Sequence, residues 1–382
     1  MKENLRSNKI LSDAGFGVTG ALLTGSFTLS VCAVTGRGLF AFLLCCALCF
    51  VFSIKNKVRI FAPHPFLLLP LFFALSGGSV LAGGLAVAGG GLLYLAITKL
   101  IKDDPIPDFV ASGMGLGVAV GVTILLTNTY FGIGADSYTP LEMLKEFRSL
   151  GFHPNFRGLF YGTITLFAMI TFPFKFKKLN RYLPAAFITL LIPFIFNLFL
   201  NPQKELTTIN EAASLVVPTS LKDEISTFIQ ISADDIPYIL KGAVGFGAIL
   251  YVLANGSSTD GFANCTTGTL TGIPVKAHTI KGYGLISAIV SIAVVTAPVL
   301  LCPGIFSRLP LHCAGSMLIV CAWQSLPLPA LKNLFKERNL IKLLLMVLCA
   351  VPFVITDVSS ATIIAFVLWV IFGRAQRKGA AK

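Results

Sequence analysis

The sequence predicts an all-α polytopic membrane protein with about 14 transmembrane segments in two inverted seven-span repeats, with short, broken helices at spans 3 and 10. Three observations lead to this fold class. Hydrophobic residues make up 55% of the 382 residues and charged residues only 12%, whereas soluble domains carry about 25% charged residues. The charges form short clusters between uncharged runs long enough to cross a bilayer. Two apolar regions are also interrupted by proline and polar residues.

The uncharged runs define the spans in chain order. The first half holds runs 14–36, 38–54, 60–98, 109–134, 158–174 and 182–201, and Ser76 to Ser79 divides the overlong third run into two. The second half begins with 236–254, which carries Lys241 in its first turns, and 255–275, which is uncharged except for Asp260. The uncharged runs 282–307, 309–331, 343–356 and 358–372 follow, with a short broken span before 282–307. We therefore expect a first repeat at 14–201, an extracytoplasmic connector at 202–235 and a second repeat at 236–372, flanked by cytoplasmic tails at 1–13 and 373–382.

Charge in the loops predicts the orientation. Basic loops at 55–59, 99–102, 175–181 and 332–342 all fall on one side of the membrane together with the basic C-terminus, and the acid-leaning stretch 202–235 falls on the other. Because positive loops stay in the cytoplasm, both termini are expected to be cytoplasmic, in a cell or inner membrane. An odd number of spans per half makes the two repeats inverted.

The two interrupted regions predict where a ligand binds. One is Thr269–Gly282, which is polar and basic, and the other is Ile60–Phe66, which reads Ile-Phe-Ala-Pro-His-Pro-Phe. Backbone breaks at membrane depth are tolerated where protein buries them or where they line a wet cavity. Paired breaks in the two halves point to the substrate site of a transporter. His64 and His278, two of the four histidines, lie in these breaks.

Composition argues against several other classes of protein. The formal net charge is +13, but the basic residues are spread over many loops, so nucleic acid is not expected as a partner. The nine cysteines lie mostly in apolar runs without zinc-like spacing, which predicts buried thiols rather than disulfides or a metal site. The sequence contains no nucleotide-binding loop or hydrolase elbow, so we expect neither an enzyme nor a cofactor.

Several stretches resemble the sulfate permease (SulP) family of anion transporters. Ile106–Val120 resembles the family's fifth span, which opens with Leu-Pro and continues as a glycine-rich helix, and Gly132-Ile133 resembles the turn after it. Leu183–Ala185 resembles the start of the seventh span, Ala263–Val275 the ninth span and its exit, and Ile355–Val358 the start of the last span. Ile60–Phe66 falls where the family has a Gly-Pro pair before its third helix. Together these stretches cover most of residues 14–372.

The resemblance implies a core domain and a gate domain, with substrate held between the facing N-termini of the third and tenth helices. Carried over by position, the site residues are Pro65, Phe66 and Leu67 on one side, Ala277, His278, Thr279 and Lys281 on the other, and Thr24, Ser26 and Phe27 from the first span. The chain departs from the family in lacking its serine-rich stretch and arginine at the tenth helix, the carboxylate of the eighth span and the C-terminal STAS domain.

The chemistry of this predicted site suits an anion. Helix N-termini present free N–H groups and partial positive charge, and Lys281 adds a full charge that a bound anion would compensate. Two alternatives stay open: Lys276 and Lys281 form an ordinary loop pair, and His64 only bonds a carbonyl freed by the prolines. Asp260 is expected to cap the ninth span or to balance Lys281.

Two further charged residues have simple structural expectations. Lys241 lies within the first turns of a span, so we expect its amine to snorkel to the membrane interface. Asp357 immediately precedes the last span, so we expect it to cap that helix.

We therefore predict a secondary transporter of a small inorganic or organic anion, of the sulfate, bicarbonate or carboxylate class, working by alternating access. The expected partners are the small anion and the lipid bilayer, with a homodimer left open. One alternative is a nucleobase permease of the uracil or xanthine type with the same general fold, which would need membrane glutamates that are not seen. Another is an anion channel or a non-transporting membrane scaffold.

Overall fold

The computed structural model describes residues 2–56, 59–77, 79–100, 106–133, 137–151, 153–200, 206–213, 226, 229–253, 258–279 and 283–373. Within these residues the chain is helical except for one two-stranded sheet and the connecting turns. The elements of the first half are α1 (Lys2–Thr35), α2 (Leu39–Asn56), β1 (Arg59–Pro63), η1 (Pro65–Leu67), α3 (Leu68–Leu75), α4 (Val80–Leu100), α5 (Asp108–Phe131), α6 (Pro140–Leu150), α7 (Phe156–Lys175), α8 (Lys177–Asn180) and α9 (Ala185–Leu200).

The second half repeats this order with small differences. Its elements are α10 (Ile209–Ala213), η2 (Ala233–Asp235), α12 (Ile236–Leu253), α13 (Ser258–Thr271), β2 (Val275–Thr279), α14 (Leu285–Leu301), η3 (Pro303–Arg308), α15 (Leu311–Gln324), α16 (Leu328–Glu337), α17 (Leu340–Ala350), α18 (Pro352–Ile355), α19 (Val358–Leu368) and η4 (Trp369–Gly373).

Helix packing reveals the internal repeat. In the first half α4 packs against α12 and α13, and in the second half its counterpart α14 packs against α1 and α2. Likewise α5 packs against α17, while its counterpart α15 packs against α7, and β1 pairs with β2. Exchanging the two halves therefore preserves the contacts, and seven elements correspond on each side. This confirms the predicted inverted-repeat membrane fold.

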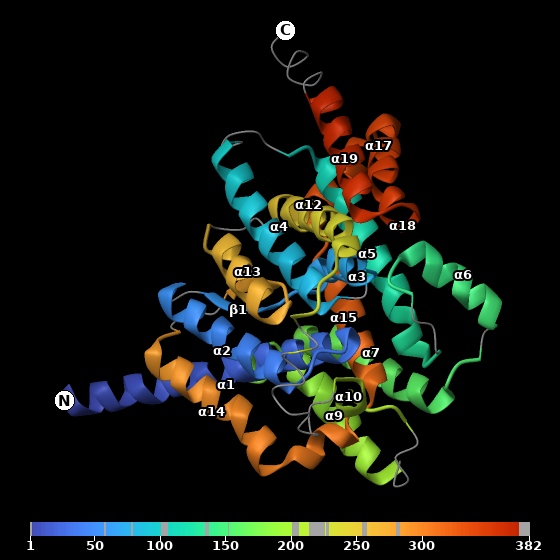
Figure 1. Ribbon diagram of the computed structural model, residues 1–382. Coiled ribbons are helices and arrows are strands. Elements are labelled where there is room, and N and C mark those ends of the chain that lie inside the picture. The colour runs from blue at the N-terminus through green and yellow to red at the C-terminus, as the bar shows by residue number, and fades with distance from the viewer. Residues whose placement is uncertain are drawn as a thin grey trace.

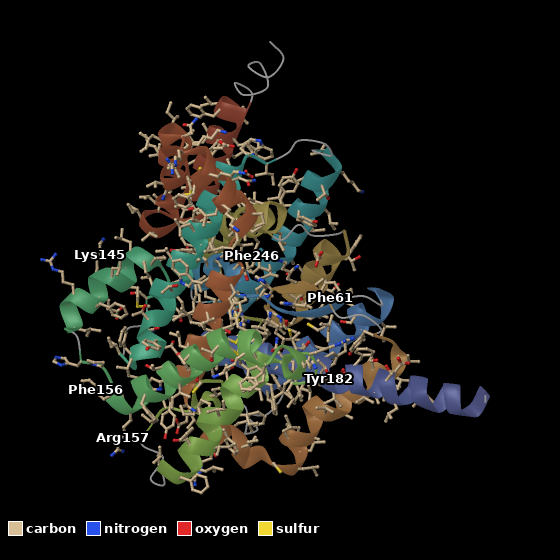
Figure 2. All side chains as sticks on the ribbon, turned by 180° about the vertical axis from the view of Figure 1, so that it is seen from behind. Phe61, Lys145, Phe156, Arg157, Tyr182 and Phe246 are labelled. Carbon is tan, nitrogen blue, oxygen red and sulfur yellow. The ribbon has the colours of Figure 1, made fainter. Side chains whose placement is uncertain are left out.

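The contacts divide the molecule into two bundles. We call α1–α4 with α12–α14 the core, and α5–α9 with α15–α19 the gate. In Figure 1, α17, α18 and α19 gather at one end, whereas α1, α9 and α14 lie toward the other end. Phe61 and Phe246 lie in the interior in Figure 2, and Lys145, Phe156 and Arg157 lie at the edge.

Among the described residues, five helices are long and apolar enough to cross a membrane, and α15 and α16, with a bend of 50° between them, are so when taken together. The same residues include six shorter apolar helical segments, among them α2, α9, α14 and the segment from η1 to α3. Large apolar side chains such as Phe167, Phe199 and Leu300 are exposed on the outer surface, as expected where lipid rather than water surrounds a protein. These features are those of a polytopic membrane protein.

Close packing inside the core depends on small residues. A Cβ atom added at Gly90 would lie 2.2 Å from the Cβ of Phe246, and one at Gly91 would lie 2.7 Å from the backbone oxygen of Gly261. Glycine is therefore needed for α4 to approach α12 and α13, in the way that small residues allow helices in membranes to come together.

Helix α1 extends beyond the predicted span. It begins at Lys2, so most of the segment predicted as an N-terminal tail is helical and continuous with the first span. Figure 1 shows this end of α1 projecting from the body of the protein. At its other end the chain reaches Arg37, whose guanidinium donates to the carbonyl oxygen of Val80 at the start of α4 (3.3 Å). The C-terminus of α1 and the N-terminus of α4 thus lie at one end of the core.

The start of α12 lies at this same end. A Cβ added at Gly77, between α3 and α4, would lie 2.7 Å from Oδ1 of Asp235. One turn into α12, the Nζ of Lys241 lies 3.5 Å from Oδ2 of Asp357, which precedes α19 in the gate. Asp357 also accepts hydrogen bonds from the backbone N–H groups of Ser359 and Ser360, so the prediction that it caps the last span is confirmed. Lys241 was expected only to snorkel; it pairs across two helices instead.

Candidate functional site

The two interrupted regions meet as an antiparallel strand pair inside the membrane fold. In the register of this pair, Ile60 lies directly opposite His278 and Ala62 lies directly opposite Lys276. Residues directly opposite each other in a sheet share a face, and alternate residues along a strand share it too. Lys276 and His278 therefore lie on one face of the pair, and His64, two residues beyond Ala62, continues that face.

The outer edges of the two strands are paired with helix side chains, because unpaired backbone groups are costly in a membrane. The Asn264 side chain on α13 accepts from the N–H of Val275 (2.9 Å) and donates to the carbonyl oxygen of the same residue (2.7 Å). On the other edge, the hydroxyl of Ser53 accepts from the N–H of Phe61 (3.0 Å), and the hydroxyl of Thr24 donates to the Phe61 oxygen (2.9 Å). The sheet is thus fixed rigidly within the core.

A cavity of about 930 Å³ lies between the core and the gate. Its walls come from α1, the β1–η1 junction and β2 on the core side, and from α7, the α8–α9 region and the end of α15 on the gate side. Asn180, Arg181, Gln324 and Ser325 are among the polar residues that line it. Arg181 is exposed and marks the mouth of the cavity.

The charge of the cavity wall is positive. Among the described residues that line it are Arg181, Lys276, His64 and His278, and that lining includes no aspartate or glutamate. Lys276 is half-buried, so its charge is only partly screened by water. The arrangement favours an anion inside the cavity over a cation.

Three aromatic rings form the floor of the cavity. The ring of His278 stacks on Phe27 of α1, with centroids 5.9 Å apart and an angle of 18° between the planes. On the side of β1 it stacks on His64, at 5.8 Å and 28°. Nε2 of His278 is buried and has no hydrogen-bond partner among the described residues. This ring nitrogen therefore has an unused capacity for a hydrogen bond beside the floor of the cavity.

His64 connects the core to the gate. Its Nδ1 accepts from the N–H of Phe66 (3.3 Å), which caps η1, so the imidazole in this arrangement is neutral with its proton on Nε2. That N–H donates to the hydroxyl of Ser325 at 3.3 Å, and Ser325 donates to the carbonyl oxygen of Cys321 (2.7 Å). The partner of His64 Nδ1 is thus an amide N–H rather than a freed carbonyl.

Of the predicted site residues, the structure brings Phe27, Pro65 and His278 together in the wall of the cavity. Phe66 and Leu67 are buried, each with 2% of its surface exposed, as part of η1. A helix therefore begins at Pro65 beside the cavity, as expected for the first interrupted region.

The other predicted residues lie elsewhere. The Thr24 hydroxyl donates to the carbonyl oxygen of Phe61 in β1. Ser26 lines a separate apolar cavity of about 130 Å³ between α1, α9 and α14. The N–H of Ala277 donates to Oδ1 of Asp260 (3.1 Å), so Asp260 fixes β2. The side chain of Thr279 and all of Lys281 lie outside the described residues, and after β2 the next described helix, α14, begins at Leu285.

Sequence reasoning missed the contributions of Lys276 and of the gate. Lys276 precedes His278 by two residues, so the alternation of a strand would have placed it on the same face. Arg181, Gln324 and Ser325 come from loops and helix ends far away in the chain. Only the tertiary structure brings them to the cavity.

Comparisons with known proteins identify the fold. No protein-family model matches the chain, and no curated protein sequence matches it. The transmembrane domain of BicA, a cyanobacterium bicarbonate transporter, is 16% identical with a TM-score of 0.62, over 94% of this chain and 97% of that domain. The structure of SLC26A9 is 12% identical with a TM-score of 0.66, over 95% of this chain and 66% of that one.

A third structure extends this likeness. The murine SLC26A9 anion transporter in the inward-facing state is 10% identical with a TM-score of 0.60, and the match covers 95% of this chain and 68% of that one. The sequence resemblance to sulfate permease transporters is thereby confirmed at the level of the fold. The chain has the fold of a membrane transporter domain, with a basic cavity between two bundles.

Proposed function

We propose that this protein is a secondary transporter of a small anion that works by alternating access. The observation that carries the proposal is the cavity between core and gate, whose described lining contains Arg181 and Lys276 but no carboxylate. The fold it shares with a bicarbonate transporter and an anion transporter supports the same function. A nucleobase permease is disfavoured because the described residues of the cavity wall include no acidic side chain that a base could bind.

In the proposed site Lys276 attracts the anion and the floor of Phe27, His64 and His278 receives it. Pro65, at the start of η1, lies in the same wall, where the N–H groups of Phe66 and Leu67 are already paired with Nδ1 and the carbonyl oxygen of His64. We propose that the basic loops lie in the cytoplasm, so that the mouth near Arg181 opens inward. The predicted domain boundaries and both cytoplasmic termini belong to this proposal, and a homodimer stays a prediction.

Uptake into proteoliposomes tests the function. The purified chain should take up a labelled small anion, such as formate, sulfate or bicarbonate, with saturation and with acceleration by the same anion trapped inside. Flux that does not saturate and shows no counter-transport would indicate a channel instead. Uracil uptake without anion uptake would favour the nucleobase permease.

Lys276→Gln tests the site. The substitution removes a charged hydrogen-bond donor worth about 1.5–3 kcal/mol, so uptake at low anion concentration should fall by about ten- to a hundredfold. Lys276→Arg should keep much of the activity because it keeps the charge. Lys99→Gln, in the last turn of α4, serves as a matched control. Equal uptake by wild type and Lys276→Gln would refute the site.

A further inference from the structure

We propose that Asp260 restricts this site to monovalent anions by offsetting the charge of Lys276; the inference rests on the proposed transport function. Asp260 lies in the first turn of α13, 1% exposed, outside the cavity wall. Its Oδ1 accepts the N–H of Ala277, the residue next to Lys276 (3.1 Å). The carboxylate is therefore held immediately behind the strand that carries the lysine into the cavity.

The charges near the cavity floor can be counted among the described residues. Lys276 carries the full positive charge at the floor, and Asp260 interacts with it electrostatically. His64 contributes no charge in this arrangement, because its Nδ1 accepts the Phe66 N–H. His278 lies between the ring of Phe27 and that of His64, and shares its strand face with Lys276, so a second positive charge there would be repelled.

This balance discriminates between anions by valence. The cost of removing an ion from water rises with the square of its charge, whereas its attraction to a fixed cation rises only in proportion to the charge. One lysine, partly offset by a buried carboxylate, can compensate a monovalent anion but leaves a divalent one under-compensated. Arg181 stands at the exposed mouth, where water screens its charge.

Asp260→Asn isolates the charge from the structural role. The asparagine keeps an oxygen that can accept the Ala277 N–H, so β2 stays supported while the negative charge is lost. Losing the negative charge removes an electrostatic repulsion that is proportional to the charge of the anion. A divalent anion therefore gains twice the interaction energy that a monovalent anion gains. At a separation of about 8–10 Å and intermediate dielectric, that difference corresponds to a change in selectivity on the order of tenfold.

The experiment measures uptake of labelled formate and labelled sulfate by the full chain in proteoliposomes, with oxalate and nitrate as competitors. Wild type should prefer formate and be inhibited better by nitrate than by oxalate. Asp260→Asn should shift the formate-to-sulfate ratio about tenfold toward sulfate. Asp260→Glu should retain the wild-type preference, and Asp108→Asn, a control at the start of α5 away from this cavity, should leave the ratio unchanged.

The outcomes separate this inference from the proposed function. Absence of saturable uptake of any anion by wild type would refute the transport function itself. Saturable uptake with a wild-type preference for sulfate, or an unchanged ratio in a folded Asp260→Asn variant, would refute the valence filter alone. If Asp260→Asn fails to fold, a wild-type preference for sulfate over formate would still refute the inference.

Discussion

Replacing Lys241 by glutamine tests whether core and gate are latched together at the end of the molecule opposite the cavity mouth. Lys241 belongs to α12 of the core and Asp357 precedes α19 of the gate, with 3.5 Å between Nζ and Oδ2. The cavity mouth at Arg181 lies beside the other end of the core, since Thr19 on α1 donates to the carbonyl oxygen of Tyr182 (3.1 Å). Figure 2 shows Tyr182 near α1.

The two contacts occupy corresponding places in the inverted repeats. α1 corresponds to α12 and α9 to α19, so the Thr19–Tyr182 hydrogen bond and the Lys241–Asp357 ion pair are counterparts at opposite ends of the core. At one end the contact is between opposite charges, and at the other it is a neutral hydrogen bond. If core and gate move against each other during transport, the ion pair must break for the cavity to open at its end.

The exposure of the pair sets the size of the effect. The side chain of Lys241 is 49% exposed and that of Asp357 is 17% exposed, so water screens most of the attraction and about 0.5–1 kcal/mol remains. Because 1.4 kcal/mol corresponds to a tenfold change in an equilibrium constant, losing the pair should alter the ratio of the two conformers about two- to fivefold. High salt should reduce the difference between wild type and variant.

Pulsed electron paramagnetic resonance between spin labels on α12 and α19, attached through non-native amino acids, would give the populations of the two conformers. Lys241→Gln and Asp357→Asn should each shift them similarly, and the double variant should shift them no further. Asparagine keeps an oxygen to cap α19. Additive shifts, or no shift in either single variant, would refute the latch.

Two stability predictions follow from the packing. Asn264→Leu removes both partners of the Val275 backbone and should destabilise the fold by about 2–6 kcal/mol, at about 1–3 kcal/mol for each buried group left unpaired; an unchanged melting temperature in detergent would contradict this role. Gly158→Ala places a Cβ 1.9 Å from Nε2 of the buried His312 and should cost about 1–3 kcal/mol by overpacking. The double variant with His312→Ala should recover part of that loss in the same melting assay.

The sequence was sufficient to predict the fold class and the meeting of the two interrupted regions. Uncharged runs and loop charges predict the fold class because a bilayer requires apolar spans and keeps basic loops on one side. The pairing of Ile60 with His278 was not predicted, since short polar breaks read equally well as loops or helix starts. The predicted charge at Lys281 lies outside the described residues and stays a prediction. Lys276 was not placed in the site, because helical rather than strand periodicity was assumed around His278.

Contacts between distant helices account for the remaining differences. Lys241 looked like an interfacial lysine because Asp357 is far from it in the chain. The resemblance placed Thr24 among the site residues, whereas in the structure its hydroxyl donates to the carbonyl oxygen of Phe61. A single polar side chain in an apolar run indicates that a partner exists, and only the packed structure identifies that partner.

The pairing of β1 with β2 also bears on how the two halves of the chain depend on each other. Each half supplies one strand, and the floor of the cavity combines His64 from the first half with His278 from the second. Neither half encloses a binding site alone, and each leaves a strand edge unpaired in a lipid environment. Two fragments produced from a chain divided in the connector would thus have to assemble before either is sheltered from degradation, and function could return only through complementation.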